Sequence, residues 1–406
     1  MNPLRKFYCR AYQTVFRIAL PLLPYREPEI LHSTDELPAL LRAKGISRVL
    51  AVTDTGIYAL HLTEPMERAL REAGIACTLY HDVTPNPTIT QVEQARSLYL
   101  QCGAQALIAF GGGSSMDCAK AAGARIVKPR QSISRMRGIL KVGRRLPLLI
   151  AVPTTAGTGS EVTLAAVITD PQSHHKYPIN DFCLIPRYAV HDPSVTVGLP
   201  GSVTATTGMD ALTHAVEAYI GRSTTRHTRA MAEEAATLIY ANLYRAYENG
   251  GDLQARANML RAAYCAGIAF TQSYVGYIHA LAHALGGRYG VPHGLANAVI
   301  LPIFLEEYGA AIHGRLGALA KICGAAAESD SDAEASGKMI AWIRRMNERM
   351  GIPRYISGIR AQDIPEMAKF ADMEANPLYP VPVLMGRAKL EEMFRKVSDP
   401  SENIER

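Results

Sequence analysis

The chain has 406 residues, of which 48% are hydrophobic and 20% are charged, and 43 Lys and Arg against 37 Asp and Glu give a net charge of +6. Such a chain buries a core and is long enough for two domains, which excludes a disordered tail and a fibrous repeat. The excess positive charge is small and scattered, so no nucleic-acid partner is expected. The seven cysteines are odd in number and include no C-x-x-C pair, a pattern that predicts reduced thiols in a cytoplasmic protein.

Residues 1–29 are interpreted as an amphipathic N-terminal extension. Its basic start and apolar stretch are superficially those of a signal peptide, but Arg17 interrupts the stretch and no small-residue cleavage site follows. Apolar residues recur near helical spacing at Phe7, Ala11, Val15, Ile18 and Leu22. We therefore expect a short helix that docks on the protein body or on a sister subunit, with no stable membrane insertion.

Residues 30–198 alternate short apolar runs with longer helical stretches, which indicates βαβ units and a mostly parallel sheet. Strands are predicted over residues 48–53, 77–83, 106–110, 146–152, 162–169 and 188–192, and helices over residues 63–72, 90–100 and 115–123. This pattern predicts a Rossmann-like, dinucleotide-binding α/β domain.

Residues 199–406 are rich in Ala, Leu, Glu and Arg and keep a helical period almost to the end. They predict an all-α domain with breaks near residues 250–251, 286–294, 351–353 and 377–382. The predicted fold class is therefore α/β followed by all-α.

The glycine-rich segment Gly111–Lys120 lies between a predicted strand and a predicted helix. Such a turn points backbone N–H groups outward at the positive end of the helix and lets a phosphate approach closely, although a tight turn without a ligand would look the same. It follows the third predicted strand, whereas the usual dinucleotide fingerprint follows the first. A second polar turn, residues 153–161, follows the fourth strand and offers further hydroxyl and N–H groups.

Asp54 ends the first of these strands. Its carboxylate could accept hydrogen bonds from a ribose diol and repel a 2′-phosphate, which would favour NAD over NADP. A helix N-cap is an equally natural role for an Asp in that place.

Five residues of the second half have spacings suited to one metal ion. Asp210 and His214 lie four residues apart on one helix face, His279 and His283 repeat that geometry, and His293 follows a glycine-rich bend. One carboxylate with imidazoles suits Fe(II), Zn(II) or Co(II). Spacing leaves five candidates for four coordination positions, so one of them could be catalytic instead.

With these motifs in place, the chain resembles the iron-containing (group III) alcohol dehydrogenases over roughly residues 30–395. The resemblance rests on five blocks in the expected order: Asp82–Thr88, Gly111–Lys120, Pro153–Thr163, Gly208–Tyr219 and His279–Asn297. It implies a Rossmann-like N-terminal domain and a helical metal-binding and substrate domain, an architecture shared with dehydroquinate synthase, with the active cleft between them. The first 28 or so residues extend beyond the usual start of the family, and residues 376–382 carry no distinctive substrate motif.

The resemblance also implies roles for individual residues. Asp210, His214, His279 and His293 would be the metal ligands, while His283 would face substrate and nicotinamide as the catalytic, proton-handling residue. The cofactor would be bound by Asp54, Asn86, Gly112, Gly113, Ser114, Asp117, Thr154, Thr155, Thr158 and Lys176. The implied cofactors are NAD, in preference to NADP, and Fe(II), with Zn(II) as the alternative.

The implied activity is an NAD(H)-linked alcohol dehydrogenase or aldehyde reductase, in which the metal binds a primary alcohol as alkoxide and hydride passes to nicotinamide. A cytoplasmic homo-oligomer, a dimer or larger, acting on a small alcohol or aldehyde is expected. A polyol or hydroxy-acid dehydrogenase is the nearest alternative, although glycerol-type enzymes usually carry Lys at position 114. A dehydroquinate synthase-like lyase would have Glu in place of Asp210, and a scaffold without chemistry would not be expected to keep every ligand.

Overall fold

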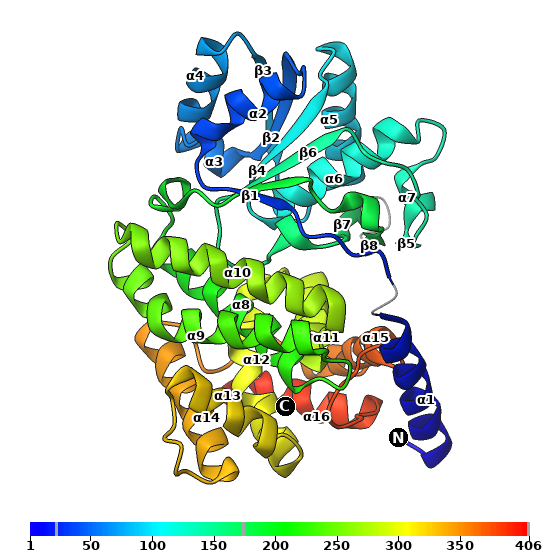
Figure 1. The fold of residues 1–406 in the computed structure, drawn as a ribbon. Helices are drawn as coiled ribbons and strands as arrows, with labels where there is room; N and C mark the ends of the chain where they lie inside the picture. Colours follow the sequence, from blue (N-terminus) through cyan, green and yellow to red (C-terminus); the bar gives the residue numbers. More distant parts are fainter. Residues whose placement is uncertain (21–22, 172–174, 404–406) are drawn as a thin grey trace. The chain divides into compact units, whose positions relative to one another are not determined.

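A computed structural model describes residues 1–20, 23–171 and 175–403, and the chain divides into two compact units. Residues 24–199 form the α/β unit, and residues 1–23 together with 200–406 form the helical unit. The N-terminal extension is thus split, because its helix belongs to the helical unit whereas residues 24–29 lead into the α/β unit (Figure 1).

The α/β unit is built on one six-stranded sheet in the order β1-β9-β6-β4-β2-β3, and every neighbouring pair is parallel. Its strands are β1 (Glu29–Leu31), β2 (Arg48–Asp54), β3 (Ala76–Val83), β4 (Ala106–Gly111), β6 (Leu148–Pro153) and β9 (Tyr188–Val190). The helices that connect them are α2 (Leu37–Ala43), α3 (Thr55–Ala59), α4 (Glu64–Glu72), α5 (Ile89–Gln101), α6 (Gly113–Val127) and α7 (Ile133–Met136). The predicted parallel Rossmann-like sheet is confirmed.

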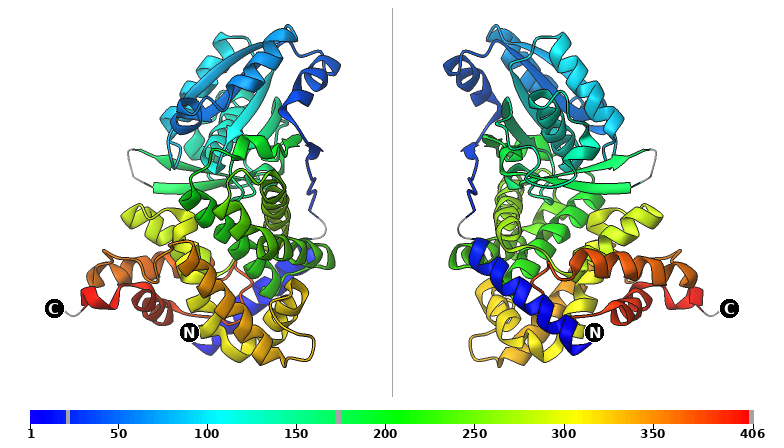
Figure 2. Two further views of the ribbon diagram at one scale, coloured as in Figure 1. Left: turned by 90° about the vertical axis from the view of Figure 1, so that its left-hand side faces the viewer. Right: turned by 90° about the vertical axis from the view of Figure 1, so that its right-hand side faces the viewer.

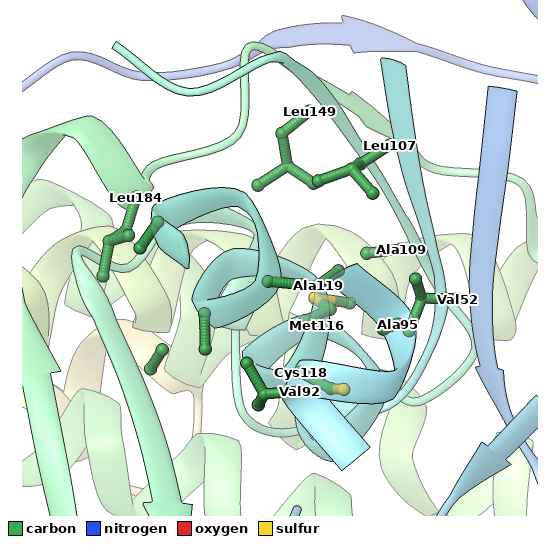
Figure 3. Close-up of a cluster of buried hydrophobic side chains, with 14 of the residues drawn as sticks. Val52, Val92, Ala95, Leu107, Ala109, Met116, Cys118, Ala119, Leu149 and Leu184 are labelled. Atoms are coloured by element: carbon green, nitrogen blue, oxygen red, sulfur yellow. The ribbon is translucent and has the colours of Figure 1, made fainter. Parts of the chain in front are cut away.

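Both faces of this sheet are covered, because successive side chains of a strand point to opposite sides. In β2, Leu50 and Val52 pack with α5 and α6 in one cluster, while Val49 and Ala51 join the cluster under α2 and α4. Figure 3 shows the first cluster, in which Met116 of α6 lies among apolar side chains of the strands. The continuous apolar runs of the sequence therefore reflect strands buried on both faces.

A second, three-stranded sheet has the order β5-β8-β7 and was only partly predicted. Its strands are β5 (Gly138–Ile139), β7 (Ala165–Asp170) and β8 (His175–Asn180), with β7 and β8 antiparallel. The strand predicted over residues 162–169 corresponds to β7, which begins only at Ala165. The residues before it wrap around the buried Lys120 ammonium, which donates to the carbonyl oxygens of Ser160, Thr163 and Ala165 at 2.6–3.0 Å.

The helical unit contains α1 (Pro3–Ala19) and the helices that follow residue 200. These are α8 (Gly201–Ile220), α9 (Arg226–Glu248), α10 (Leu253–Ser273), α11 (Tyr277–Tyr289), α12 (His293–Tyr308), α13 (His313–Cys323), α14 (Asp332–Arg349), α15 (Ile364–Ala375) and α16 (Arg387–Val397). The breaks near residues 250, 351 and 377 lie between helices as predicted. Gly286 and Gly287 lie inside α11, which ends at Tyr289 and has Gly290 as its C-cap. Among the described residues, no helix is both long and apolar enough to span a bilayer.

Candidate active site

The predicted cofactor residues of the α/β unit gather at the carboxyl ends of β2 and β4. From β2 the chain moves to β3 on one side of it, and then returns to β4 on the other side. Open α/β sheets bind their ligands at the carboxyl ends of the strands where the strand order reverses in this way.

Asp54 lies at this point, at the end of β2. One of its carboxylate oxygens accepts from the Ile57 backbone N–H at 2.9 Å and caps α3, and the other accepts from the Ser115 hydroxyl at 3.1 Å. The N-cap reading is therefore confirmed. The contact with Ser115 also ties the end of β2 to the glycine-rich turn after β4.

The two polar turns predicted to cradle phosphate lie against each other. Gly112 is the N-cap residue of α6 and offers no side chain to its first turn, so the backbone N–H groups there face outward without a side-chain cap. A Cβ on Gly112 would lie 3.3 Å from the Thr155 hydroxyl, and one on Gly113 would lie 3.1 Å from Thr158. Threonine side chains therefore pack directly on the glycines. The Thr154 hydroxyl is buried and has no hydrogen-bond partner within the described residues.

Three more predicted cofactor residues meet beside this turn. Asn86 has a left-handed backbone, with φ of 60°, and its N–H lies 3.4 Å from the Ser114 hydroxyl. The Lys176 ammonium donates to the Asn86 side-chain oxygen at 2.7 Å. These contacts bring together residues from segments 90 positions apart.

Asp117 differs from the other predicted cofactor residues because both its oxygens are engaged inside the protein. One accepts from the Ser160 hydroxyl at 3.1 Å and the other from the Val167 N–H at 3.0 Å. Burial raises the pKa of Asp117, against the opposing influence of Lys120. Asp117 thus holds residues 160–167 in place. These contacts favour a structural role, in which Asp117 supports the glycine-rich turn, over direct contact between Asp117 and the cofactor.

In the helical unit, Asp210, His214, His279 and His293 converge. Each offers one ligand atom, and these four atoms all lie within 4.8 Å of one another. Asp210, His214 and His279 are buried, and His293 is half-buried. The four residues come from α8, α11 and α12, so the cluster is made by packing three helices together.

A close helix crossing makes this convergence feasible. Gly294, in the first turn of α12, lies against α8, where an added Cβ would come within 2.5 Å of the Thr206 carbonyl oxygen. Only glycine permits this approach, which places the His293 Nε2 atom 3.5 Å from an Asp210 oxygen. The bend before His293 was predicted from the sequence, but the contact with α8 was not.

Glu217 orients His279. Its buried carboxylate lies 2.6 Å from the His279 Nδ1 and accepts from the backbone N–H groups of Gly276 and Ile278. A hydrogen at Nδ1 leaves the lone pair of Nε2 directed at the cluster, which is the tautomer that a metal requires. Burial raises the pKa of Glu217, and its hydrogen bonds with Gly276, Ile278 and His279 oppose that shift because they favour the ionised carboxylate.

Asn297 marks the common focus of the ligand atoms. Its side-chain nitrogen lies 2.6 Å from an Asp210 oxygen and 3.2 Å from the Nε2 atoms of both His279 and His293. Three acceptors thus point to one place. Burial, and then the neighbouring imidazoles, hold the pKa of His279 well below its usual value, so that this ring is neutral. One carboxylate and three imidazoles at these distances fit a divalent metal such as iron or zinc.

His283 lies beside this cluster but outside it. Its Nδ1 lies 2.6 Å from a Glu374 oxygen, and its ring is stacked on that of His293 with centroids 5.2 Å apart. The Tyr379 hydroxyl donates to the same Glu374 oxygen at 2.6 Å. Although burial acts to raise the pKa of Glu374, the charge of His283 and the two hydrogen bonds outweigh it and hold that pKa below its usual value.

The sequence analysis did not single out Glu217, Asn297 or Glu374. Glu217 is seven residues after Asp210 and Asn297 is four residues after His293, so helical periodicity could have placed both on the ligand-bearing faces. No comparable signal exists for Glu374, which is 91 residues from His283.

Comparison with known proteins agrees with this arrangement. Residues 31–193 match the profile of iron-containing alcohol dehydrogenases, and residues 204–398 match the C-terminal profile of the Fe-containing alcohol dehydrogenase family. The chain belongs to the iron-containing alcohol dehydrogenase family. The predictions of family, fold class and alcohol dehydrogenase activity are thereby confirmed.

Individual relatives cover nearly the whole chain. A 1,3-propanediol dehydrogenase of Klebsiella pneumoniae is 36% identical over 89% of this chain and 94% of its own length, and an NAD-dependent methanol dehydrogenase of Bacillus methanolicus is 36% identical over 84% and 91%. Among solved structures, an alcohol dehydrogenase from Oenococcus oeni superposes with a TM-score of 0.87 at 32% identity over 92% of this chain and all of its own. A sulfoacetaldehyde reductase from Bifidobacterium kashiwanohense in complex with NAD+ superposes with a TM-score of 0.81 at 28% identity, over 92% and 98% of the two chains.

Proposed function

We propose that this alcohol dehydrogenase interconverts a short primary alcohol and its aldehyde, using NAD(H) and one Fe(II) ion, with Zn(II) as the alternative metal. The observation that carries the proposal is the set of four ligand atoms, from Asp210, His214, His279 and His293, within 4.8 Å of one another. The relatives' names, which include 1,3-propanediol and methanol dehydrogenases, support a short alcohol as substrate.

When bound, the metal supplies a Lewis acid that lowers the pKa of an alcohol, and the nicotinamide accepts the hydride. The side chains of this protein would hold the metal. Asp210 contributes the negative charge, the three imidazoles contribute nitrogen lone pairs, and Glu217 keeps His279 in the tautomer that can bind.

His283 is proposed to handle the proton. Its Nδ1 is engaged by Glu374, which leaves Nε2 to take a proton from the alcohol or to return one to the aldehyde. The negative charge of Glu374 stabilises the protonated ring, and the Tyr379 hydroxyl fixes the position of that carboxylate.

In the α/β unit, we propose that the cofactor binds over the outward N–H groups of α6, with Asn86, Gly112, Gly113, Ser114, Thr154, Thr155, Thr158 and Lys176 around it. The Asp54 carboxylate would accept from the ribose diol and repel a 2′-phosphate, which supports NAD rather than NADP. The NAD+ complex of the sulfoacetaldehyde reductase supports the same choice. A cytoplasmic location and a homo-oligomeric state are further proposals, and the seven free cysteines of the chain support the first.

The experiment is NADH and NADPH oxidation against a panel of short aldehydes, dihydroxyacetone and keto acids. The protein is stripped of metal and reconstituted anaerobically with Fe(II), with Zn(II) or with nothing. We expect Fe(II) to restore the fastest turnover, with a short aldehyde and NADH. A preference for a keto acid or a polyol-derived ketone would favour a polyol or hydroxy-acid dehydrogenase. No oxidation of NADH or NADPH with any metal and any carbonyl compound would contradict the proposal.

The variant Asp54→Asn tests whether the charge of Asp54 determines the preference for NADH over NADPH. An Asn side chain keeps an acceptor for the Ile57 N–H but removes the negative charge. The preference for NADH over NADPH should therefore narrow while folding is kept, and an unchanged preference would remove Asp54 from cofactor selection.

A further inference from the structure

Helix α1 docks on the helical unit, and it lies before residue 31, where the match to the family profile begins. Figure 2 shows this helix, in dark blue, along the outside of the unit. Cys9 and Gln13 are buried in the contact, and the Arg5 guanidinium forms an ion pair with Asp372 of α15 at 2.8 Å. The contact is therefore made by polar and charged side chains as well as by an apolar one.

Residues 377–382, which we call the 377–382 segment, lie between α15 and α16 and form neither a helix nor a strand. Such a segment has no regular backbone partner for its carbonyl oxygens, so other groups must donate to them. Side chains of α1 donate to four of these oxygens at 2.7–3.2 Å. Gln13 serves those of Pro377 and Tyr379, and Arg10 serves those of Val381 and Pro382. The path of the 377–382 segment therefore depends on a helix from the opposite end of the chain.

The Gln13 amide is oriented for this task by Arg10. The Arg10 guanidinium donates to Gln13 Oε1 at 2.8 Å, which leaves the amide nitrogen, with its two hydrogens, to face the carbonyl oxygens. The Tyr379 carbonyl oxygen also accepts from the Val381 N–H at 2.9 Å, and the Tyr379 N–H donates to the Ala375 carbonyl oxygen at 2.7 Å. The backbone of Tyr379 is thus held on both sides, and Gln13 is one of the groups that hold it.

A second contact joins α1 to Tyr379 through aromatic rings. The ring of Phe16 meets that of Tyr274 edge-on with centroids 5.0 Å apart, and the centroids of the Tyr274 and Tyr379 rings lie 6.3 Å apart. Tyr274 follows α10 with φ of 62°, a conformation that residues other than glycine rarely adopt and that persists where surrounding contacts hold it. Both the backbone and the ring of Tyr379 are therefore connected to α1.

The Tyr379 hydroxyl links these contacts to the proposed proton-transfer group. It donates to the same Glu374 oxygen that lies 2.6 Å from the His283 Nδ1. Burial, and then the negative charge of Glu374, hold the pKa of Tyr379 well above its usual value, so the hydroxyl keeps the proton that it donates. A displaced Tyr379 would leave Glu374 with one partner fewer and His283 less firmly oriented.

We propose that Gln13 is a positioning residue for proton transfer, because it fixes the backbone of Tyr379, whose hydroxyl holds Glu374 against His283. The proposal rests on the proton-handling role proposed above for His283. A misplacement of about 1 Å in an active site can lower turnover about 100-fold, even when its cause lies far from the chemistry. Helix α1, which lies outside the family profile, thus supports the reaction through Tyr379.

The test is steady-state NADH oxidation by Gln13→Met, which keeps the length of the side chain but removes the amide. We expect kcat to fall about fivefold or more, while the KM for NADH and the metal content stay at the wild-type values, because the cofactor residues and the ligands are unaltered. Gln13→Asn, whose amide is one carbon shorter, should act in the same direction and replaces Gln13→Met if that variant does not fold. The matched control is Thr14→Ala, an exposed position on the same helix whose hydroxyl donates to the Arg10 carbonyl oxygen, and its kcat should not change.

A double-mutant cycle determines whether Gln13 acts through Tyr379. Tyr379→Phe should lower kcat at least as much as Gln13→Met does. The double variant Gln13→Met/Tyr379→Phe should then stay within about twofold of Tyr379→Phe, because the hydroxyl that Gln13 positions is already absent. A merely structural role of Gln13 would lower kcat by the same factor in both backgrounds.

An unchanged kcat in Gln13→Met, or equal effects of this substitution in the two backgrounds, would overturn the proposal. His283→Ala, measured in the same assay, separates this proposal from the proposed function. If kcat falls in His283→Ala but not in Gln13→Met, only the role of Gln13 is wrong. If kcat is unchanged in both variants, the proton-handling role of His283 is wrong as well.

Discussion

At the scale of single residues, the proposal assigns metal binding and proton transfer to different side chains. Asp210 and three histidines share one focus, whereas His283 is turned to Glu374. Two substitutions distinguish these roles.

His283→Ala should lower turnover about 100-fold or more while the metal content stays near one per chain, because the variant loses a proton-transfer group and no ligand. The measurements are steady-state NADH oxidation and metal analysis of the same sample. His227→Ala, at the exposed start of α9, is the control and should keep its turnover. If His283→Ala lost its metal, the proton-handling role would be wrong.

Glu217→Gln should weaken metal binding about 10- to 100-fold. A glutamine amide that donates to His279 Nδ1 selects the tautomer with hydrogen on Nε2, and that nitrogen then cannot bind a cation. Competition with a chelator measures the affinity, and Glu248→Gln, an exposed position on α9, serves as the control. Unchanged affinity in Glu217→Gln would show that the carboxylate does not orient His279.

Asp363 shows how a single carboxylate couples stability to pH. It accepts from Arg288, Tyr289 and Arg360 at 2.6–2.9 Å, which holds its pKa well below the usual range. Its stabilising contribution is therefore complete above about pH 4, where the carboxyl of an unfolded chain is also ionised, and is lost as pH falls through the lowered pKa. Asp363→Asn should lower the thermal midpoint at pH 7, and its difference from the wild-type protein should shrink near pH 3. A difference independent of pH would contradict this account.

At the scale of elements, the metal cluster depends on how closely α12 crosses α8. Gly294→Ala should push the two helices apart because the new methyl group would collide with the Thr206 carbonyl oxygen. Overpacking of this kind costs about 1–3 kcal/mol of stability, and His293 should move away from Asp210.

Thermal unfolding and metal titration of Gly294→Ala measure both effects. The control is Gly337→Ala inside α14, where an added methyl group meets no atom within 4 Å. It should keep metal affinity and gain up to about 1 kcal/mol of stability from helix propensity. Equal metal affinity in the two variants would show that the close crossing is not needed.

The sequence predicted elements where the pattern is local. Five strands of the main sheet, the α6 turn and α1 follow from periodicity and glycine placement, whereas the short edge strand β1 (Glu29–Leu31) was not predicted. The strand predicted over residues 162–169 begins only at Ala165, because Lys120, about 40 residues earlier, determines the path of residues 160–165. Glu374 likewise gains its position only through tertiary contact with His283. Neither contact produces a periodic pattern in the sequence from which it could be predicted.

At the scale of the whole molecule, the chain divides its chemistry between two units. The α/β unit presents outward N–H groups, hydroxyls and one carboxylate at the ends of β2 and β4, and the helical unit presents one carboxylate and three imidazoles. The first set suits a dinucleotide and the second suits a divalent metal. An alcohol dehydrogenase of the iron-containing family needs both.

The most direct test of the central claim is metal stoichiometry together with turnover in single-ligand variants. The wild-type chain should bind one equivalent of metal, whereas Asp210→Ala and His279→Ala should bind less than about a tenth of that and lose aldehyde reduction in parallel. NADH binding, followed by its fluorescence, should persist in both variants, because the cofactor residues lie in the other unit. Full metal content and normal turnover in Asp210→Ala would contradict the assignment of this cluster as the catalytic metal site.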